Sequence, residues 1–313
     1  MDITLIRTFL EVSATGSFVS ASERLFVTQS AVSLRIQRIE QSLGKRLFTR
    51  SKAGAELTSA GREFEKYALS LIKLWEEARQ QIAIPEGFSK SLSIGAQYSL
   101  WPRLGFRWLD GLRANMPDLS IRTESGLPDR LMRYLIEGSI QVGLMYTPQL
   151  RPGLTVEKLM EDELVLVASW ADPTLDLTGR YVFVDWGPEF VHAHAIALPH
   201  LTNPGLTHNL GAQAAEYVVN RECAAYLPAR YISRDLKEGR LHLVPDAPVF
   251  PFPVWVVWRD DLDPELAEIA RDTLALVVEQ ADANQEAIIA TLREISENDE
   301  IEVLGETPDI QRE

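Results

Sequence analysis

The 313-residue chain contains a single cysteine, Cys223. A disulfide within the chain needs two cysteines, so this cross-link is excluded, and a chain without disulfides fits a reducing compartment. The sequence also has no uninterrupted run of 18 apolar residues, which a membrane-spanning helix requires. Because its first residues are typical of a folded helix rather than of a secretory signal, we expect a cytoplasmic location.

Sequence signatures of common catalytic sites are missing, among them G-x-S-x-G, the phosphate-binding P-loop, H-E-x-x-H and C-x-x-C. His192 and His194 form an H-x-H pair, with His200 and His208 nearby in the sequence, but a metal site would need further ligands. Surface or capping histidines are far more common than such sites. We therefore expect no catalytic residue, no metal, no cofactor and no enzymatic activity.

Positive charge is scarce overall, since 45 acidic residues oppose 31 Lys and Arg and give a formal net charge of −14. Seven cations nevertheless fall between positions 24 and 52, where Glu40 is the single acid. A polyanionic partner explains such a basic island more simply than a solvated surface does. The charge pattern therefore favours a protein that binds nucleic acid.

The basic island carries the pattern of two short helices separated by a turn. Ser17 is suited to cap a helix over residues 18–25, and Thr28 to cap a second helix over residues 28–43, which Gly44 ends. Apolar residues spaced by 4, 3 and 4 predict the buried stripe of the second helix: Val32, Ile36, Ile39 and Leu43. The segment therefore reads as a helix-turn-helix.

The outward face of the second helix is polar and suits the major groove of DNA. Ser and Gln hydrogen-bond base edges, Arg suits guanine or phosphate, and Leu34 can touch a thymine methyl. Two short strands around a turn at residues 52–54 predict a wing that carries Arg50 and Lys52 to the phosphate backbone. The predicted DNA contacts from the helix are Thr28, Gln29, Ser30, Ser33, Leu34, Arg35, Gln37 and Arg38.

Residues 58–84 form a continuous helical pattern without proline. A small N-terminal domain has little core left to cover such a helix, so pairing with a second copy is favoured over packing on its own domain. Apolar residues spaced by 4 and 3 in turn predict the seam of this dimer: Phe64, Ala68, Leu71, Trp75, Ala78 and Ile82.

From residue 91 onward, predicted strands alternate with predicted helices, which indicates a largely parallel α/β domain. The two parts of the chain differ in charge. Residues 1–84 hold 12 Lys and Arg against 9 Asp and Glu, while residues 85–313 hold 19 against 36. The acidic part is repelled by DNA, so we expect it to face away from the duplex.

Several polar or aromatic residues follow predicted strands or begin predicted helices, where ligands bind in open α/β sheets. Hydroxyl groups and free backbone N–H groups at such positions suit a small anion such as a carboxylate. The predicted effector-binding residues are Ser99, Trp101, Ser125, Gly126, Tyr146, Trp186 and Gly211. An aromatic residue at such a position is more often part of the core than of a binding site. Ser99 is the strongest candidate, because it lies between the end of a predicted strand and the start of a predicted helix.

The order TFLEVSATGSFVSASERLFVTQSAVSLRIQRIEQSLGKRLFTR, followed by LTSAG, resembles the N-terminal domain of LysR-type transcriptional regulators. One departure is that many members carry Arg directly after the serine of the recognition helix, where this chain has Leu34. A narrower resemblance, to the HdfR-like subgroup, rests on TQSAVS-x-RI and on Asp185-Trp186-Gly187-Pro188.

The resemblance implies a winged helix-turn-helix, a long dimerising linker helix and a C-terminal effector-binding domain. It also implies that this domain has two Rossmann-like lobes around a cleft, as in periplasmic solute-binding proteins. Lobe 1 would comprise residues 91–160 and 250–280, and lobe 2 residues 165–245. The predicted domains are winged helix-turn-helix 1–58, dimerisation helix 59–84, hinge 85–90, effector-binding domain 91–280, and C-terminal helix with acidic tail 281–313.

The sequence thus predicts a DNA-binding transcriptional regulator whose DNA binding or bending responds to a small, plausibly anionic effector. Its expected partners are an operator in double-stranded DNA, further copies of itself in a dimer or tetramer, and RNA polymerase. The alternative is an enzyme or solute-binding protein that uses a helix-turn-helix for protein contacts. The missing catalytic motifs weigh against this alternative.

Overall fold

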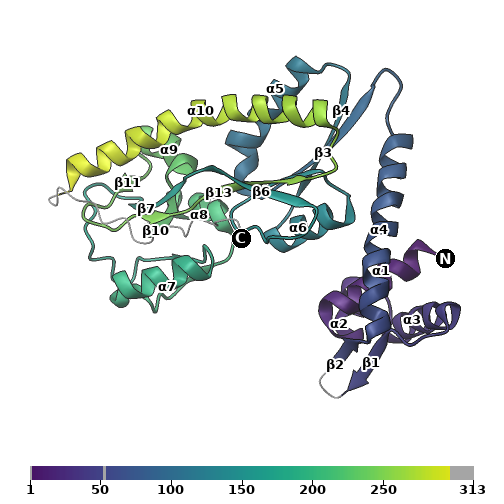
Figure 1. The fold of residues 1–313 in the computed structure, drawn as a ribbon. Helices are drawn as coiled ribbons and strands as arrows, with labels where there is room; N and C mark the ends of the chain where they lie inside the picture. The colour runs from purple at the N-terminus through teal and green to yellow at the C-terminus, as the bar shows by residue number, and fades with distance from the viewer. Residues whose placement is uncertain (1, 52–53, 297–313) are drawn as a thin grey trace.

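The computed structural model describes residues 2–51 and 54–296. A small N-terminal domain is joined by one long helix to a larger α/β domain (Figure 1). Among the helices in these residues, none is both long enough and apolar enough to cross a bilayer.

The N-terminal domain begins with three helices, α1 (Ile3–Thr15), α2 (Phe18–Arg24) and α3 (Gln29–Leu43). The Ser17 hydroxyl accepts from the Ser20 N–H, and the Thr28 hydroxyl accepts from the Ala31 N–H, so both predicted N-caps are confirmed. Gly44 ends α3 with a φ of 66°, a left-handed conformation that favours glycine.

Strands β1 (Phe48–Ser51) and β2 (Gly54–Leu57) form the antiparallel wing. Gly54 has a φ of 133°, and a Cβ there would lie 2.6 Å from the carbonyl oxygen of Gly16. Glycine therefore lets the wing return close to the end of α1. In the core, the ring of Phe9 packs against Phe48 and Phe64, with ring centroids 5.2 and 4.8 Å away.

The linker helix α4 (Ser59–Ile82) shares this core, because Phe64, Ala68 and Ile72 are buried in it. The predicted dimer seam is therefore wrong at its first two positions. Phe64 and Ala68 cover α1 of their own chain and leave no surface for a second helix. The remaining seam positions, from Leu71 to Ile82, are exposed.

The described part of the larger domain holds one main sheet in each lobe and a short two-stranded sheet in lobe 2. The five-stranded sheet of lobe 1 has the order β4-β3-β5-β13-β6. The helices α5 and α6 belong to the same lobe. The bounds are β3 (Lys90–Ala96), β4 (Leu119–Ser125), β5 (Val142–Met145), β6 (Leu154–Met160), β13 (Val254–Arg259), α5 (Phe106–Asn115) and α6 (Pro128–Glu137).

In lobe 2, strand β7 pairs with β10, β11 and β12, and a separate short pair joins β8 to β9. The bounds are β7 (Glu163–Ala168), β8 (Phe183–Val184), β9 (Thr207–His208), β10 (Ala224–Pro228), β11 (His242–Leu243), β12 (Phe250–Pro251), α7 (Pro188–Ala197), α8 (Ala214–Val219) and α9 (Ala229–Lys237). The chain passes between the lobes twice, from β6 to β7 and from β12 to β13.

The prediction of largely parallel sheets is wrong for much of the domain. Strands β4, β3 and β5 are parallel, but β13 runs antiparallel to both of its neighbours. All of the ladders on β7 are antiparallel as well. The physical reason is the double crossing, because a strand that returns from the other lobe enters its sheet from the opposite end.

The last helix, α10 (Pro264–Ile295), is one continuous element that runs across the predicted boundary between the effector-binding domain and the C-terminal helix at residues 280–281. Near its start it packs on α5, where the indole N–H of Trp108 donates to the Ala270 carbonyl at 3.0 Å. Near its end, Ile288 and Leu292 are buried beside lobe 2. The helix therefore lies along both lobes (Figure 1). The predicted acidic tail from residue 297 lies outside the described residues.

Candidate functional sites

The outward face of α3 exposes most of the side chains predicted to read DNA. Exposed residues on or beside this helix are Thr28, Gln29, Ser30, Leu34, Gln37 and Arg38. Ser33 is half-buried at the edge of the face. The buried stripe beneath is Val32, Ile36 and Ile39, as the sequence predicted, but Leu43 is 38% exposed at the end of the helix. A polar helix face backed by an apolar core is the geometry that enters a major groove.

Four of the side chains predicted to contact DNA also make contacts within their own domain. The Thr28 hydroxyl caps α3 and lies 2.9 Å from the Ser30 hydroxyl. Arg35 donates to the Thr8 hydroxyl at 3.3 Å, so its guanidinium is held on α1. Arg50 on the wing lies over the ring of Phe18, 3.9 Å from its centroid. Lys52 lies outside the described residues, and these DNA roles stay predictions.

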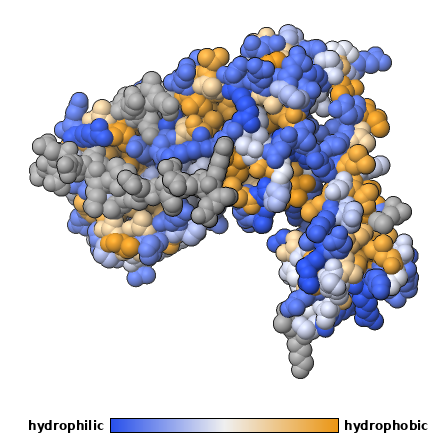
Figure 2. All heavy atoms as spheres, viewed as in Figure 1, coloured by the Kyte–Doolittle hydropathy of each residue, from blue (hydrophilic) through white to orange (hydrophobic). Residues whose placement is uncertain are grey.

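The exposed part of α4 carries an apolar face, and the sequence predicted only some of the residues on it. Side chains exposed by 38–86% lie on this face: Tyr67, Leu71, Leu74, Trp75 and Ile82. Figure 2 shows hydrophobic residues gathered over the helix between the two halves of the molecule. The dimer seam predicted from the sequence included neither Tyr67 nor Leu74. The heptad spacing was counted from Phe64 and Ala68, which pack in the N-terminal core, so it missed part of the face of α4 that is exposed.

A cavity of about 70 Å³ lies where the two lobes meet. Its lining residues come from both lobes and from the first crossing: Ser99, Leu100, Leu104, Arg107, Tyr146, Met160, Asp162, Arg230, Tyr231 and Val254. The Ser99 hydroxyl donates to the Tyr146 oxygen at 3.3 Å, and the Tyr146 N–H donates to the Gln97 side chain at 2.8 Å. Burial raises the pKa of Tyr146, which keeps its hydroxyl protonated.

Asp162 is the central charged residue of this cavity. It is 4% exposed, it lies on the first crossing, and its carboxylate is 3.8 Å from the Arg230 guanidinium. It also accepts from the Glu163 N–H at 2.9 Å. Burial raises the pKa of Asp162 to about 6, although the nearby Arg230 opposes the shift. A carboxyl group poised near neutrality in a cavity is a frequent feature of functional sites.

Aromatic rings close the cleft on one side of the cavity. Tyr146 stacks on Phe252 of the second crossing with centroids 3.9 Å apart, and Phe252 meets Trp186 edge-on at 5.2 Å. The indole N–H of Trp186 donates to the Tyr226 carbonyl at 2.9 Å. Pockets for drug-sized ligands usually measure about 300–1,000 Å³. An effector of more than a few atoms therefore requires these rings or the lobes to move apart.

Of the residues predicted to bind the effector, Ser99 and Tyr146 line this cavity. Trp101, Ser125, Gly126, Trp186 and Gly211 lie outside its wall, and their role in effector binding stays a prediction. The sequence missed Asp162 and Arg230. Their one sequence signal is that each lies at the boundary of a strand, Asp162 just before β7 and Arg230 just after β10.

The histidines of the H-x-H pattern lie on α7. His194 is buried, and its Nε2 lies 2.8 Å from the Tyr181 hydroxyl. Burial lowers the pKa of His194 to about 4, so the ring is neutral near pH 7. In the part of the chain that the structure describes, no three His, Cys, Asp or Glu residues are grouped so as to hold a metal ion.

Comparison with known proteins gives two family matches. Residues 3–62 match the bacterial regulatory helix-turn-helix protein, lysR family, and residues 85–280 match the LysR substrate binding domain. The HTH-type transcriptional regulator HdfR of Escherichia fergusonii is 31% identical over 287 residues, which cover 89% of this chain and 98% of that protein. HdfR from strains of Escherichia coli is equally similar, at 31% identity over 281 residues.

Solved structures share the fold over most of the chain. A full-length OxyR variant from Pseudomonas aeruginosa has a TM-score of 0.53 at 20% identity and covers 88% of this chain and 98% of its own. Full-length LysG from Corynebacterium glutamicum with bound effector arginine has a TM-score of 0.53 at 18% identity, with 90% and 99% covered. The chain belongs to the LysR family of transcriptional regulators, with a DNA-binding domain before the linker helix and an effector-binding domain after it.

Proposed function

We propose that this regulator reads an operator through the exposed face of α3, as a dimer paired along α4, and that a small effector in the interlobe cavity changes this binding. The observation that carries the proposal is the polar face of α3 on a basic domain. The basic domain is joined through the helix α4 to a second domain that has its own cavity. In this proposal the protein acts in the cytoplasm and contacts RNA polymerase from the operator.

Salt dependence of DNA affinity tests the DNA-binding part of the proposal. Each phosphate contact releases counterions, so the logarithm of operator affinity should fall linearly and steeply with the logarithm of salt concentration. An enzyme or solute-binding protein that uses the helix-turn-helix for protein contacts would show no such operator-specific slope. Fluorescence anisotropy with an operator and a scrambled duplex between 50 and 300 mM salt separates the two functions.

The proposed effector is small and carries a group that accepts hydrogen bonds, such as a carboxylate. Support comes from the donors around the cavity, which are the Ser99 and Tyr146 hydroxyls and the guanidinium groups of Arg107 and Arg230. Asp162 opposes an anion while it is charged. Because burial brings its pKa to about 6, it can take up a proton at modest cost when an anion enters.

Replacing Ser99 by alanine is expected to weaken the response to the effector without changing folding or operator binding. One neutral hydrogen bond contributes about 0.5–1.5 kcal/mol, which is roughly a twofold to tenfold loss of affinity. A thermal-shift screen of cell metabolites identifies the compound, and titration of Ser99→Ala measures the loss. Ser120→Ala is the matched control, because Ser120 is a half-buried serine of β4 in the same lobe that lies outside the cavity and is not among the predicted effector-binding residues. Equal losses in both variants would remove Ser99 from the site.

The raised pKa of Asp162 is expected to make the effector domain less stable as pH rises from about 4 to about 6. The folded state holds this proton more tightly than the unfolded state does, so raising the pH through this range favours unfolding. A rise of this pKa from 3.8 to about 6 corresponds to about 3 kcal/mol. Denaturant unfolding can be followed by tryptophan fluorescence. Between pH 4 and 7, the free energy of unfolding of wild type should fall by about 3 kcal/mol relative to that of Asp162→Asn. A difference that is independent of pH would contradict the assignment.

A further inference from the structure

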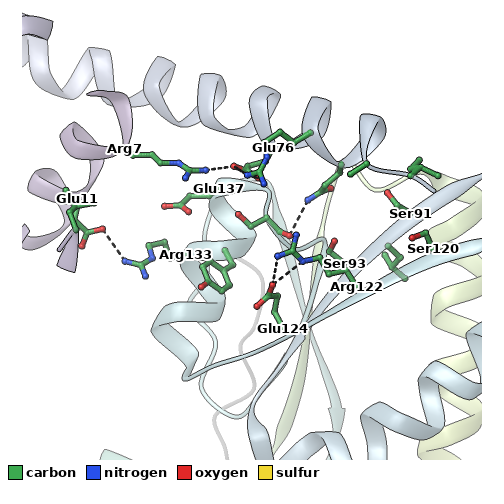
Figure 3. A pocket seen from close by; sticks show the side chains of 18 of the residues that line it. Arg7, Glu11, Glu76, Ser91, Ser93, Ser120, Arg122, Glu124, Arg133 and Glu137 are labelled. Carbon is green, nitrogen blue, oxygen red and sulfur yellow. Dashed lines mark hydrogen bonds and ion pairs between the residues drawn. The ribbon is translucent and has the colours of Figure 1, made fainter. Parts of the chain in front are cut away.

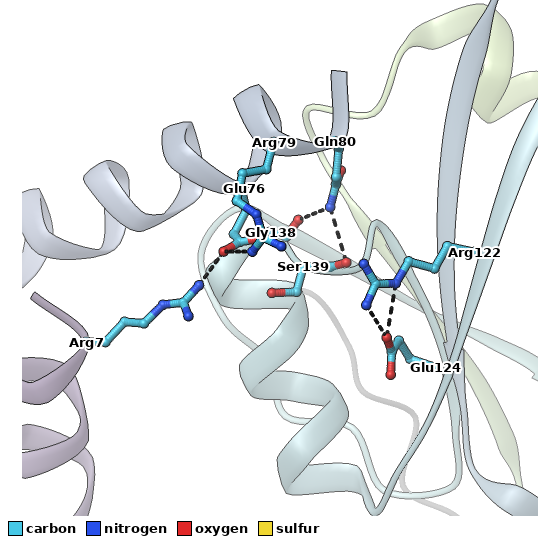
Figure 4. A network of polar contacts seen from close by, with 8 residues as sticks. All are labelled: Arg7, Glu76, Arg79, Gln80, Arg122, Glu124, Gly138 and Ser139. Carbon is cyan, nitrogen blue, oxygen red and sulfur yellow. Dashed lines mark hydrogen bonds and ion pairs between the residues drawn. The ribbon is translucent and has the colours of Figure 1, made fainter. Parts of the chain in front are cut away.

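Lobe 1 touches the DNA-binding domain and α4 of its own chain through polar groups. Gln80 on α4 donates to the carbonyl oxygens of Gly138 and Ser139 at 2.9 and 3.2 Å (Figure 4). Gln141 donates back to the Gln80 side chain at 2.8 Å. Two ion pairs add to these contacts at the end of β13: Lys73 with Asp261, and Glu77 with Arg259, the latter at 3.1 Å.

A further contact bypasses α4 and reaches the DNA-binding domain directly. Glu11 on α1 is 9% exposed and accepts from Arg133 on α6 of lobe 1 at 3.2 Å. It also pairs with Arg24 of its own domain at 3.3 Å. Figure 3 shows Arg133 extended toward Glu11 across the space between the two halves. Glu11 is therefore a nearly buried carboxylate whose charge is balanced partly by the other domain.

Apolar packing does not hold this interface together. The core of the DNA-binding half consists of residues between positions 3 and 72, and the cores of the effector domain begin at residue 92. Within the described residues, neither core contains a side chain of the other half. Between the halves lies a polar cleft of about 440 Å³. In each ion pair at least one side chain stays partly exposed, by 39% for Arg133, 44% for Glu77 and 40% for Lys73. Water and salt reach these side chains, so the contacts can separate and re-form.

The interface also lies at the far ends of the strands that border the effector cavity. Gln141 directly precedes β5, and Tyr146 directly follows it in the cavity wall. Val254 begins β13 in the cavity wall, and Arg259 ends it at the interface. Strand β5 pairs along its whole length with residues 255–258 of β13. A shift of β5 and β13 at the cavity therefore displaces the groups that hold α4.

From this geometry we infer that the polar interface is a releasable clasp, in which Arg133 of lobe 1 holds Glu11 of the DNA-binding domain in the same chain. With the clasp closed, the effector domain has a fixed direction relative to α4 and the DNA-binding domain. With it open, the two halves turn about residues 83–89 while both cores stay intact. The clasp is a property of the chain without effector, so its test does not depend on the effector site proposed above.

A double-mutant cycle on the full-length dimer tests the clasp. Glu11→Gln, Arg133→Gln and the double variant are digested with chymotrypsin, and cleavage after Phe88 in the connecting segment is timed. Each single variant should be cut roughly twofold to fivefold faster than wild type, as for loss of one partly exposed ion pair. The double variant should be cut no faster than either single one, since all three lack the same contact.

Two controls separate the clasp from general loosening. Arg122→Gln changes an arginine in the same cleft whose partner, Glu124, lies in lobe 1, and Arg24→Gln removes only the partner of Glu11 within its own domain. Both should be cut at the wild-type rate. High salt should speed the cleavage of wild type more than that of Arg133→Gln. Additive effects in the cycle, or equal acceleration in Arg122→Gln, would overturn the clasp.

Discussion

Replacing Leu71 by glutamate should convert the protein to monomers and weaken operator binding by about 10²–10⁴-fold. Leu71 lies at the middle of the exposed apolar face of α4, between Tyr67 and Trp75. Pairing of two chains along this face would bury the new carboxylate without a partner, which is strongly unfavourable. A monomer then holds a single half-site and loses the gain in effective concentration that links two binding modules.

Light scattering at micromolar concentration measures the mass, and anisotropy measures operator affinity. Lys66→Glu is the matched control, because it introduces a carboxylate on the same helix at an exposed polar position. This variant should keep the mass and affinity of wild type. A Leu71→Glu protein that remains dimeric and binds the operator normally would move the dimer contact away from this face.

The sequence predicted the helices of the N-terminal domain best, because their caps and apolar stripes depend on residues close together in the chain. The Ser17 and Thr28 caps, the Gly44 stop and the buried stripe of α3 each depend on residues within a few positions of one another. The dimer seam was different. A heptad pattern shows which side of a helix is apolar, but it does not show that Phe64 and Ala68 are already covered by α1 of the same chain.

The effector domain was harder to predict, because its cavity depends on contacts between residues far apart in the chain. Asp162 and Arg230 are 68 positions apart and meet through the crossing between the lobes. Their positions at strand boundaries are the one local signal, and many other residues of the chain share it. Strand β13 is antiparallel to its neighbours because of the same crossings between the lobes. The alternation of strands and helices in the sequence therefore predicted which elements are present but not the directions of the strands.

Alanine at Gln29 or at Ser33 is expected to reduce the discrimination between operator and random DNA. Gln29 is exposed at the start of α3, and Ser33 lies one turn later at the edge of the same face. A good base contact contributes about 1–3 kcal/mol of discrimination, which is roughly a 5- to 150-fold change in the affinity ratio. Because neither side chain is fully buried, truncation should leave the domain folded, and circular dichroism checks this.

The same experiment with Arg50→Ala should give a different pattern. Arg50 lies on the wing with its guanidinium over the ring of Phe18, and we expect this side chain to contact phosphate rather than a base edge. Its loss should weaken binding to all sequences alike and flatten the dependence on salt, while the operator preference stays unchanged. Ser42→Ala, an exposed change in the last turn of α3, serves as the control for the helix. If Gln29→Ala and Ser33→Ala kept the full operator preference while Arg50→Ala lost it, sequence would be read by the wing and not by this face of α3.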